Sequence, residues 1–332
     1  MSGAGGVAMG PDHLILLLAA LALDAYVGDW FMGRGGSWHP AAIVIRLAGG
    51  LERRLNRAAR GEGALRVRGA LATAAILGAA VAAGIALDFA SDHAPLLWVA
   101  EFGVIAVVIE SRAPYSRIAD LAAAIEDGVP ADAEATLARI APRDPVHADA
   151  HEMARIGIEA LAVGLATGVV GPVLAYLVLG SPGLLGYCAV RALGQHFGRG
   201  RPETVAFGAA ARVVERIVAV IPGPLGALAI AVAALAQPRA SSWRAFVTIA
   251  RDARRHPDAG AGWPVAAMAG ALGLALAGPR RYTARVVKDP WIGRGRARAE
   301  PEDMRRALGL FVRAVVLLGA MIVLGALARG GG

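Results

Sequence analysis

Polar residues that could carry chemistry stand at the edges of apolar runs, where an ionisable side chain is costly and indicates function. The first group contains Asp24, Asp29 and His39. Asp24 falls inside an apolar run, so it is either part of a binding site or a structural residue that caps a helix or pairs within a bundle.

A second group follows a stretch with helical patterning and begins with Arg143 and Asp144. Further charged residues recur at spacings of three and four, which place them on one helix face: His151, Glu152, Arg155 and Glu159. Opposite charges at such spacings most often form solvated pairs. Glu159 differs because it enters an apolar run, where an unpaired carboxylate is expensive.

The third group is basic and is followed by a Gly-Trp-Pro string. Its members are Trp243, Arg251, Asp252, Arg254, Arg255, His256, Gly262, Trp263, Pro264 and Tyr282. Guanidinium groups bind phosphate and carboxylate through paired hydrogen bonds, so this group suits a polyanionic ligand. A basic face against anionic lipid headgroups explains the same charges.

Common soluble catalytic motifs are absent. The chain contains no GxxxxGK[ST], HExxH or GxSxG string. Its single cysteine, Cys188, excludes an intramolecular disulfide and any zinc or iron–sulfur site built from several cysteines.

The elements that would position these residues are membrane helices. Hydrophobic residues make up 56% of the 332 positions and charged residues only 18%, clustered between the apolar runs. Five runs approach the roughly 20 residues that span a bilayer as a helix, near 13–32, 69–90, 95–110, 155–180 and 308–328. Two others, 217–236 and 263–278, are interrupted by proline or glycine and predict broken or re-entrant elements.

Arginine-rich segments predict the orientation. Segment 31–68 has eight arginines against two glutamates, and segment 280–306 is similarly basic. The positive-inside rule places both in the cytoplasm, and the polar stretch 112–154 predicts a cytoplasmic helical hairpin. We therefore expect one all-α domain over 1–332, a polytopic helical bundle with cytoplasmic helical loops.

Several strings together resemble one family. Residues 251–256 (RDARRH), 262–273 (GWPVAAMAGALG), Gly278-Pro279 and Tyr282 resemble a signature of the adenosylcobinamide-phosphate synthase family of cobalamin biosynthesis. Further matches run in the same order over nearly the whole chain: Asp24 with Gly28-Asp29, His39-Pro40, 51–55 (LERRL), Ala138-Arg139, Arg143-Asp144, Ile158-Glu159, 168–170 (GVV) with Pro172, and 291–293 (WIG).

The resemblance implies an amide-forming ligase in the cell (inner) membrane. Such an enzyme joins the propionate carboxylate of a corrinoid, adenosylcobyric acid, to aminopropanol phosphate with ATP and magnesium. It implies catalytic roles for Asp144, Glu159, Asp252 and His256, with Asp144 and Asp252 as metal ligands. Substrate-binding roles would fall to Asp24, Asp29, His39, Arg143, Arg251, Arg254, Arg255, Trp263 and Tyr282. Expected partners are membrane lipid and other cobalamin-pathway enzymes, and no nucleic acid.

The chain departs from the family pattern where acids and amides are usual. It carries Val163, Gly164, Thr167, Arg191, Gly194 and Gly260 there, and Glu215-Arg216 replaces a typical acidic pair. Loss of such groups would remove metal and nucleotide ligands together. A non-catalytic relative that binds a corrinoid or a pathway enzyme is therefore the alternative, and a small-solute transporter is the third interpretation.

Overall fold

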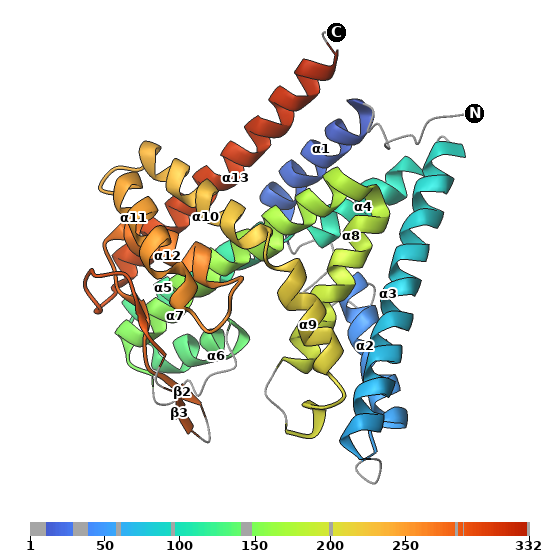
Figure 1. Cartoon of the computed structure of the whole chain (residues 1–332). Coiled ribbons are helices and arrows are strands. Elements are labelled where there is room, and N and C mark those ends of the chain that lie inside the picture. The colour runs from blue at the N-terminus through green and yellow to red at the C-terminus, as the bar shows by residue number, and fades with distance from the viewer. Residues whose placement is uncertain are drawn as a thin grey trace. The chain divides into compact units, whose positions relative to one another are not determined.

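The chain folds almost entirely as helices. The computed structural model describes residues 11–28, 39–57, 61–93, 97–140, 148–198, 202–282, 285–287 and 289–330. In the first half of the chain the helices are α1 (Pro11–Val27), α2 (Pro40–Leu55), α3 (Glu62–His93), α4 (Trp98–Val108), α5 (Arg112–Glu126), α6 (Pro130–Ile140) and α7 (Ala150–Gly164). They are followed by the π-helical η3 (Leu165–Val170), α8 (Gly171–Phe197), η4 (Pro202–Thr204), α9 (Ala209–Val218), α10 (Pro222–Ala233), η5 (Ala234–Ala236), α11 (Ser242–Asp252), η6 (Ala253–Arg255), α12 (Gly262–Leu272) and α13 (Pro301–Gly330). Figure 1 shows this helical architecture.

The chain divides into two compact units that alternate along the sequence. Unit 1 comprises Met1–Ile109, Gly171–Val218 and Met321–Gly332, and unit 2 comprises Glu110–Val170 and Ala219–Ala320. Each unit is therefore built from segments that are distant in sequence.

In unit 1, α3 packs along α8, and α2 and α9 pack against both. Val44, Ile76, Leu193 and Phe207 form part of their shared apolar core. α8 is broken at Gly180, whose φ of 64° and ψ of −152° are not helical, and Pro182 stands two residues later. The sequence did not predict this break; the interruption that it predicted in 217–236 lies between α9, which ends at Val218, and α10, which begins at Pro222.

In unit 2, α12 lies at the centre and packs against α7, α10 and α11. Every residue of α12 except Trp263 is buried, which suits a helix that is apolar on all sides. The amphipathic helices α5 and α6 pack against each other and against α7 through apolar residues such as Ile118, Leu121 and Leu137.

Short strands follow α12 and were not anticipated from the sequence. β1 (Leu276–Ala277) pairs antiparallel with β4 (Trp291–Ile292), and β2 (Arg280–Tyr282) pairs antiparallel with β3 (Arg285–Val287). Both pairs are too short to show the alternation that predicts strands.

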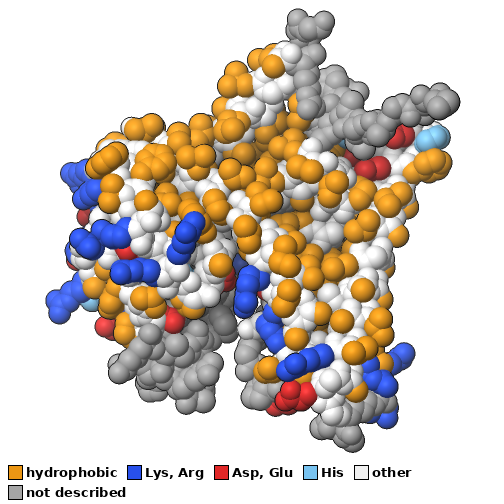
Figure 2. All heavy atoms as spheres, in the orientation of Figure 1, with side chains coloured by type: hydrophobic (Ala, Val, Ile, Leu, Met, Phe, Trp, Pro, Cys, Tyr) orange, Lys and Arg blue, Asp and Glu red, His pale blue; other side chains and the backbone are white. Residues whose placement is uncertain are grey.

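Within the described residues, four helical stretches are long and apolar enough to cross a membrane: 62–93, 150–197, 209–236 and 301–328. Apolar side chains on α3, including Leu71, Ile85 and Phe89, are more than half exposed, as expected for a face in contact with lipid. Figure 2 shows hydrophobic side chains along α3 and basic side chains near the end where it begins. The chain is an all-α polytopic membrane protein.

Candidate functional site

Asp252 is the centre of the basic group in unit 2. It is the last residue of α11 and is 1% exposed. Its Oδ1 accepts hydrogen bonds from Arg251 Nε at 2.9 Å and Arg255 Nη1 at 3.4 Å. Its Oδ2 accepts from Arg251 Nη2 at 2.6 Å and from the backbone N–H of Gly293 at 3.0 Å. Four donors therefore surround one buried carboxylate.

The hydrogen bonds between Arg251 and Asp252 favour the charged form of both side chains. The hydrogen bond from Arg251 lowers the pKa of Asp252, and the same bond raises the pKa of Arg251. Because Asp252 takes Nε and Nη2 of Arg251, the Nη1 amine keeps its donors for another acceptor. The arginine side chains of Arg251 and Arg255 are 29% and 62% exposed, and Arg254 is also exposed. The result is a pre-oriented cationic surface that suits phosphate or carboxylate.

Gly293 can reach Asp252 because its backbone has a φ of +91°, a conformation that favours glycine. A Cβ at this position would lie 2.3 Å from the carbonyl oxygen of Leu274. Gly293 directly follows β4, so Asp252 ties α11 to the end of that strand.

His256 lies at the turn between η6 and α12 and is 8% exposed. Its Nδ1 lies 3.0 Å from both the backbone nitrogen and the carbonyl oxygen of Asp258, so the ring accepts from the N–H or donates to the oxygen according to its tautomer. Asp258 Oδ1 in turn accepts from the N–H groups of Gly260 and Ala261, just before α12 begins. The start of α12 packs closely against η6. A Cβ on Gly262 would lie 2.1 Å from the carbonyl oxygen of Ala253, so only glycine fits at this position.

The charged face of α7 contacts residues that come much later in the chain. Glu159 is 6% exposed, and its Oε1 accepts the N–H of Ala277 in β1 at 2.8 Å. Arg155 donates to the carbonyl oxygen of Ala297 at 2.8 Å, and its guanidinium lies 5.4 Å from the ring centre of Trp291. His151 Nδ1 is 2.9 Å from the carbonyl oxygen of Ala299. One face of α7 thus contacts Ala277, Trp291, Ala297 and Ala299.

Unit 2 contains most of the predicted site residues that the structure describes. Glu159, Asp252, His256, Arg251, Arg254, Arg255 and Trp263 belong to it, and Tyr282 is described by its backbone in β2. Asp29, Arg143 and Asp144 lie outside the described residues.

Asp24 and His39 belong to unit 1. Asp24 lies on α1 and is partly buried. His39 caps the start of α2: its Nδ1 accepts the N–H of Ala41 at 3.1 Å, and its Nε2 is 3.2 Å from the carbonyl oxygen of Val107.

Asp252 does not fit a magnesium ion in this arrangement. Both carboxylate oxygens already accept two hydrogen bonds each, and two guanidinium groups adjoin them. A hard cation needs several oxygen ligands, and among the described residues no group of three His, Cys, Asp or Glu could hold one. The predicted role of Asp252 as a metal ligand therefore does not agree with its surroundings, and metal ligation by Asp144, which lies outside the described residues, remains a prediction.

Two of the sequence departures have a physical explanation. A Cβ on Gly194 would lie 2.1 Å from Cδ of Glu215, so the carboxylate of α9 occupies the space beside Gly194 in unit 1. A Cβ on Gly260 would lie 2.7 Å from Cβ of Ala219 in unit 2. An acid at position 194 or an amide at position 260 therefore has no room in this packing.

Sequence reasoning missed two contributors, the N–H of Gly293 and the backbone contacts of His151 and Arg155. The only signal for the first was the Trp291-Ile292-Gly293 string, and the second had only the helical spacing of α7.

The chain is 31% identical to the "Cobalamin biosynthesis protein CobD" of Brucella melitensis over 313 residues, which cover 93% of this chain and 96% of the relative. It is 32% identical to the protein of that name from Rhodobacter capsulatus over 318 residues, covering 94% and 96%. No solved structure matches the chain. The CobD/Cbib protein family matches residues 17–311. This match includes the buried Asp252, the arginines around it and the Gly293 that completes their cluster, and the chain belongs to the CobD/Cbib protein family.

Proposed function

We propose that this member of a cobalamin biosynthesis family forms the amide bond between the propionate carboxylate of adenosylcobyric acid and aminopropanol phosphate, giving adenosylcobinamide phosphate. The observation that carries the proposal is the Arg251–Asp252–Arg255 cluster, in which a buried carboxylate orients two partly exposed guanidinium groups. Both substrates and ATP are anionic, so they require such cations.

In the proposed reaction, the terminal phosphoryl group of ATP is transferred to a carboxylate oxygen, and ADP leaves. The amine then attacks the carbonyl carbon, phosphate leaves with the C–O electron pair, and the nitrogen loses a proton. ATP with magnesium supplies the activating phosphoryl group when bound.

The residues of the chain bind and orient these groups. The outward donors of Arg251 and Arg255 hold phosphate oxygens, and Asp252 positions both side chains without touching substrate. His256 exchanges the amine proton, directly or through water. Glu159 holds β1 at the edge of the site.

We further propose that the protein resides in the cell (inner) membrane with segments 31–68, 112–154 and 280–306 facing the cytoplasm, where ATP is available. The arginine excess of 31–68 and 280–306 supports this orientation, and 112–154 is assigned to the same side as a polar helical hairpin.

The direct test is amidation by the purified full chain in lipid nanodiscs, with adenosylcobyric acid, aminopropanol phosphate, ATP and magnesium. Mass spectrometry should detect adenosylcobinamide phosphate with one ADP released per amide. Arg251→Gln should reduce turnover about 100-fold. The exposed Arg298, which lies outside this cluster, provides a matched control as Arg298→Gln. Equal turnover in both variants would overturn the assigned role of Arg251.

A second function, a non-catalytic corrinoid-binding protein, is favoured by one observation: the carboxylate of Asp252 is already saturated by arginine and backbone donors. Under this alternative, the wild type binds adenosylcobyric acid but releases neither amide nor ADP. Binding without turnover would therefore reject the enzyme proposal.

A further inference from the structure

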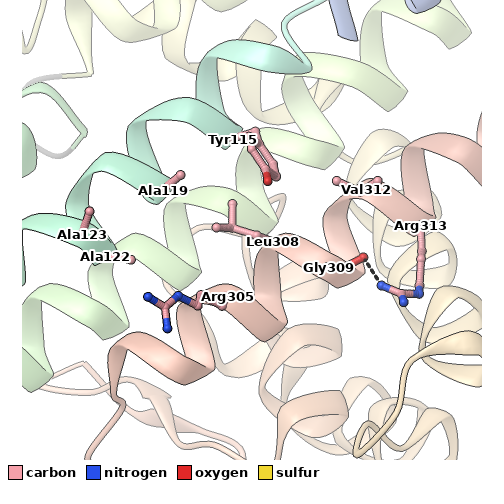
Figure 3. Close-up of a pocket in the computed structure, with 9 residues that line it drawn as sticks. All are labelled: Tyr115, Ala119, Ala122, Ala123, Arg305, Leu308, Gly309, Val312 and Arg313. Atoms are coloured by element: carbon pink, nitrogen blue, oxygen red, sulfur yellow. Dashed lines mark hydrogen bonds between the residues drawn. The ribbon is translucent and has the colours of Figure 1, made fainter. Parts of the chain in front are cut away.

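Unit 2 contains an open cavity of about 540 Å³ between α5 and α13, away from the cluster around Asp252. Figure 3 shows nine residues that line it. They are Tyr115, Ala119, Ala122 and Ala123 on α5, and Arg305, Leu308, Gly309, Val312 and Arg313 on α13.

Most of the side chains that line the cavity are small or apolar. α5 contributes three alanines, and α13 contributes Leu308 and Val312. Val312 is 44% exposed, and Val316 one turn further along the same helix is 64% exposed. The apolar wall therefore continues onto the outer surface of α13, which is one of the helices long and apolar enough to cross a membrane.

Arg313 lies within this apolar part of α13. Its Nη1 donates to the carbonyl oxygen of Gly309 at 3.0 Å, so the guanidinium reaches back toward the start of the helix (Figure 3). No carboxylate of the described residues forms an ion pair with it. A cation in a membrane-crossing helix is expensive, so an unneutralised arginine here indicates an anionic partner.

A second cation lines the cavity two turns earlier on α13 (Figure 3). Arg305 is one turn before Gly309, and its side chain is 63% exposed. It pairs with Glu126 at the end of α5, which leaves other guanidinium donors for a second acceptor. Between the two arginines, the Tyr115 hydroxyl points into the space between the helices (Figure 3).

We propose that this cavity binds an anionic phospholipid. Its phosphate accepts hydrogen bonds from Arg313, Arg305 adds positive charge at the other end of the cavity, and one acyl chain lies along the alanines of α5, Leu308 and Val312. A basic pocket beside a membrane-crossing helix is the usual setting for such headgroups. A small phosphorylated molecule would satisfy the arginines but would leave the continuous apolar wall uncovered.

The test compares phosphatidylglycerol with phosphatidylcholine of identical acyl chains, added to delipidated full-length protein in detergent. Native mass spectrometry reports retained lipid, and thermal unfolding reports stabilisation. The wild type should prefer phosphatidylglycerol about tenfold or more. Arg313→Gln should abolish that preference, since a charge-assisted contact is lost.

A second variant separates the cavity from the charge. Ala119→Phe fills the apolar wall while both arginines remain, and it should weaken binding of phosphatidylglycerol. Arg298→Gln removes an exposed arginine outside the cavity and should leave the preference intact. Equal retention of the two lipids, or an unchanged preference in Arg313→Gln, would refute the lipid site. Displacement of phosphatidylglycerol by inorganic phosphate or aminopropanol phosphate would also refute it in favour of a small anion. None of these readouts depends on amidation.

Discussion

Glu159 and Asp252 come from different helices and bind opposite strands of one ladder. Glu159 accepts the N–H of Ala277 in β1, and Asp252 accepts the N–H of Gly293 directly after β4. β1 and β4 pair through Leu276 with Ile292 and Ala277 with Trp291. Two buried acids therefore hold a short ladder that has few hydrogen bonds of its own.

Glu159→Gln and Glu159→Ala should have different effects. The amide oxygen of glutamine can still accept the N–H of Ala277, whereas alanine leaves that buried donor unpaired, at a cost of about 1–3 kcal/mol. We expect Glu159→Ala to lower the unfolding midpoint and to accelerate proteolysis within 277–299. If Glu159→Gln is equally destabilised, the charge of Glu159, and not its acceptor oxygen, maintains the fold.

Asp252→Asn should raise the KM for the anionic substrates and lower kcat by about 100-fold, because an amide cannot orient two guanidinium groups as a carboxylate does. Steady-state amidation kinetics would measure both constants. Asp127→Asn, at an exposed position after α5, is the matched control. Wild-type constants in Asp252→Asn would show that the cluster does not position the arginines for catalysis.

The lowered pKa of Asp252 predicts a pH dependence. Its carboxylate stabilises the folded state at pH values above its unfolded pKa of about 3.9, and this contribution disappears as the pH falls through the lower folded value. The difference in unfolding midpoint between wild type and Asp252→Asn should therefore be constant near pH 6–7 and shrink below about pH 4. A difference that persists unchanged at pH 3 would contradict this linkage.

Gly194→Asp tests the space that Glu215 fills. The new side chain would meet the Glu215 carboxylate, and overpacking with like charge should cost about 1–3 kcal/mol. Glu215→Ala in the same chain should recover much of this loss. Denaturant unfolding of the four members of the cycle would give their coupling energy.

A control for that cycle is Gly50→Asp, since a Cβ on Gly50 meets no atom within 4 Å. Additive effects of the two changes at 194 and 215 would mean that the side chains do not share one space.

The predicted orientation can be tested with one cysteine. Arg298→Cys is an exposed position in the basic segment 280–306, and Cys188→Ser removes the buried native thiol. An impermeant maleimide added outside intact cells should fail to label residue 298 until the membrane is permeabilised. Efficient labelling of intact cells would reverse the orientation.

The longest apolar runs predicted helices, but two runs expected to span the membrane, 13–32 and 95–110, correspond to the shorter α1 and α4. The prediction of an all-α membrane protein is confirmed, whereas the break in α8 at Gly180 was not predicted. The division into two units was not predicted, because α7 and α8 form one continuous helical stretch, 150–197, with no linker between the units. The strands β1 and β4 are two residues long and carry no periodicity.

For the site, the sequence identified Arg251, Asp252 and Arg255 as a group, since they are adjacent on one helix end. It did not show that Asp252 is enclosed by donors, because Gly293 is 41 residues away and contributes only its backbone. Backbone donors leave no side-chain signature. The same limit hid the partners of His151 and Arg155, which are carbonyl oxygens of 299 and 297.

The charged face of α7 has a consequence for biosynthesis. The partners of Glu159, Arg155 and His151 are 118, 142 and 148 residues later in the chain. At typical synthesis rates of about 5–20 residues per second, the ribosome makes them roughly 6–30 seconds after α7. During that interval these polar groups need water, headgroups or an insertion factor as temporary partners, which favours late entry of α7 into the bilayer.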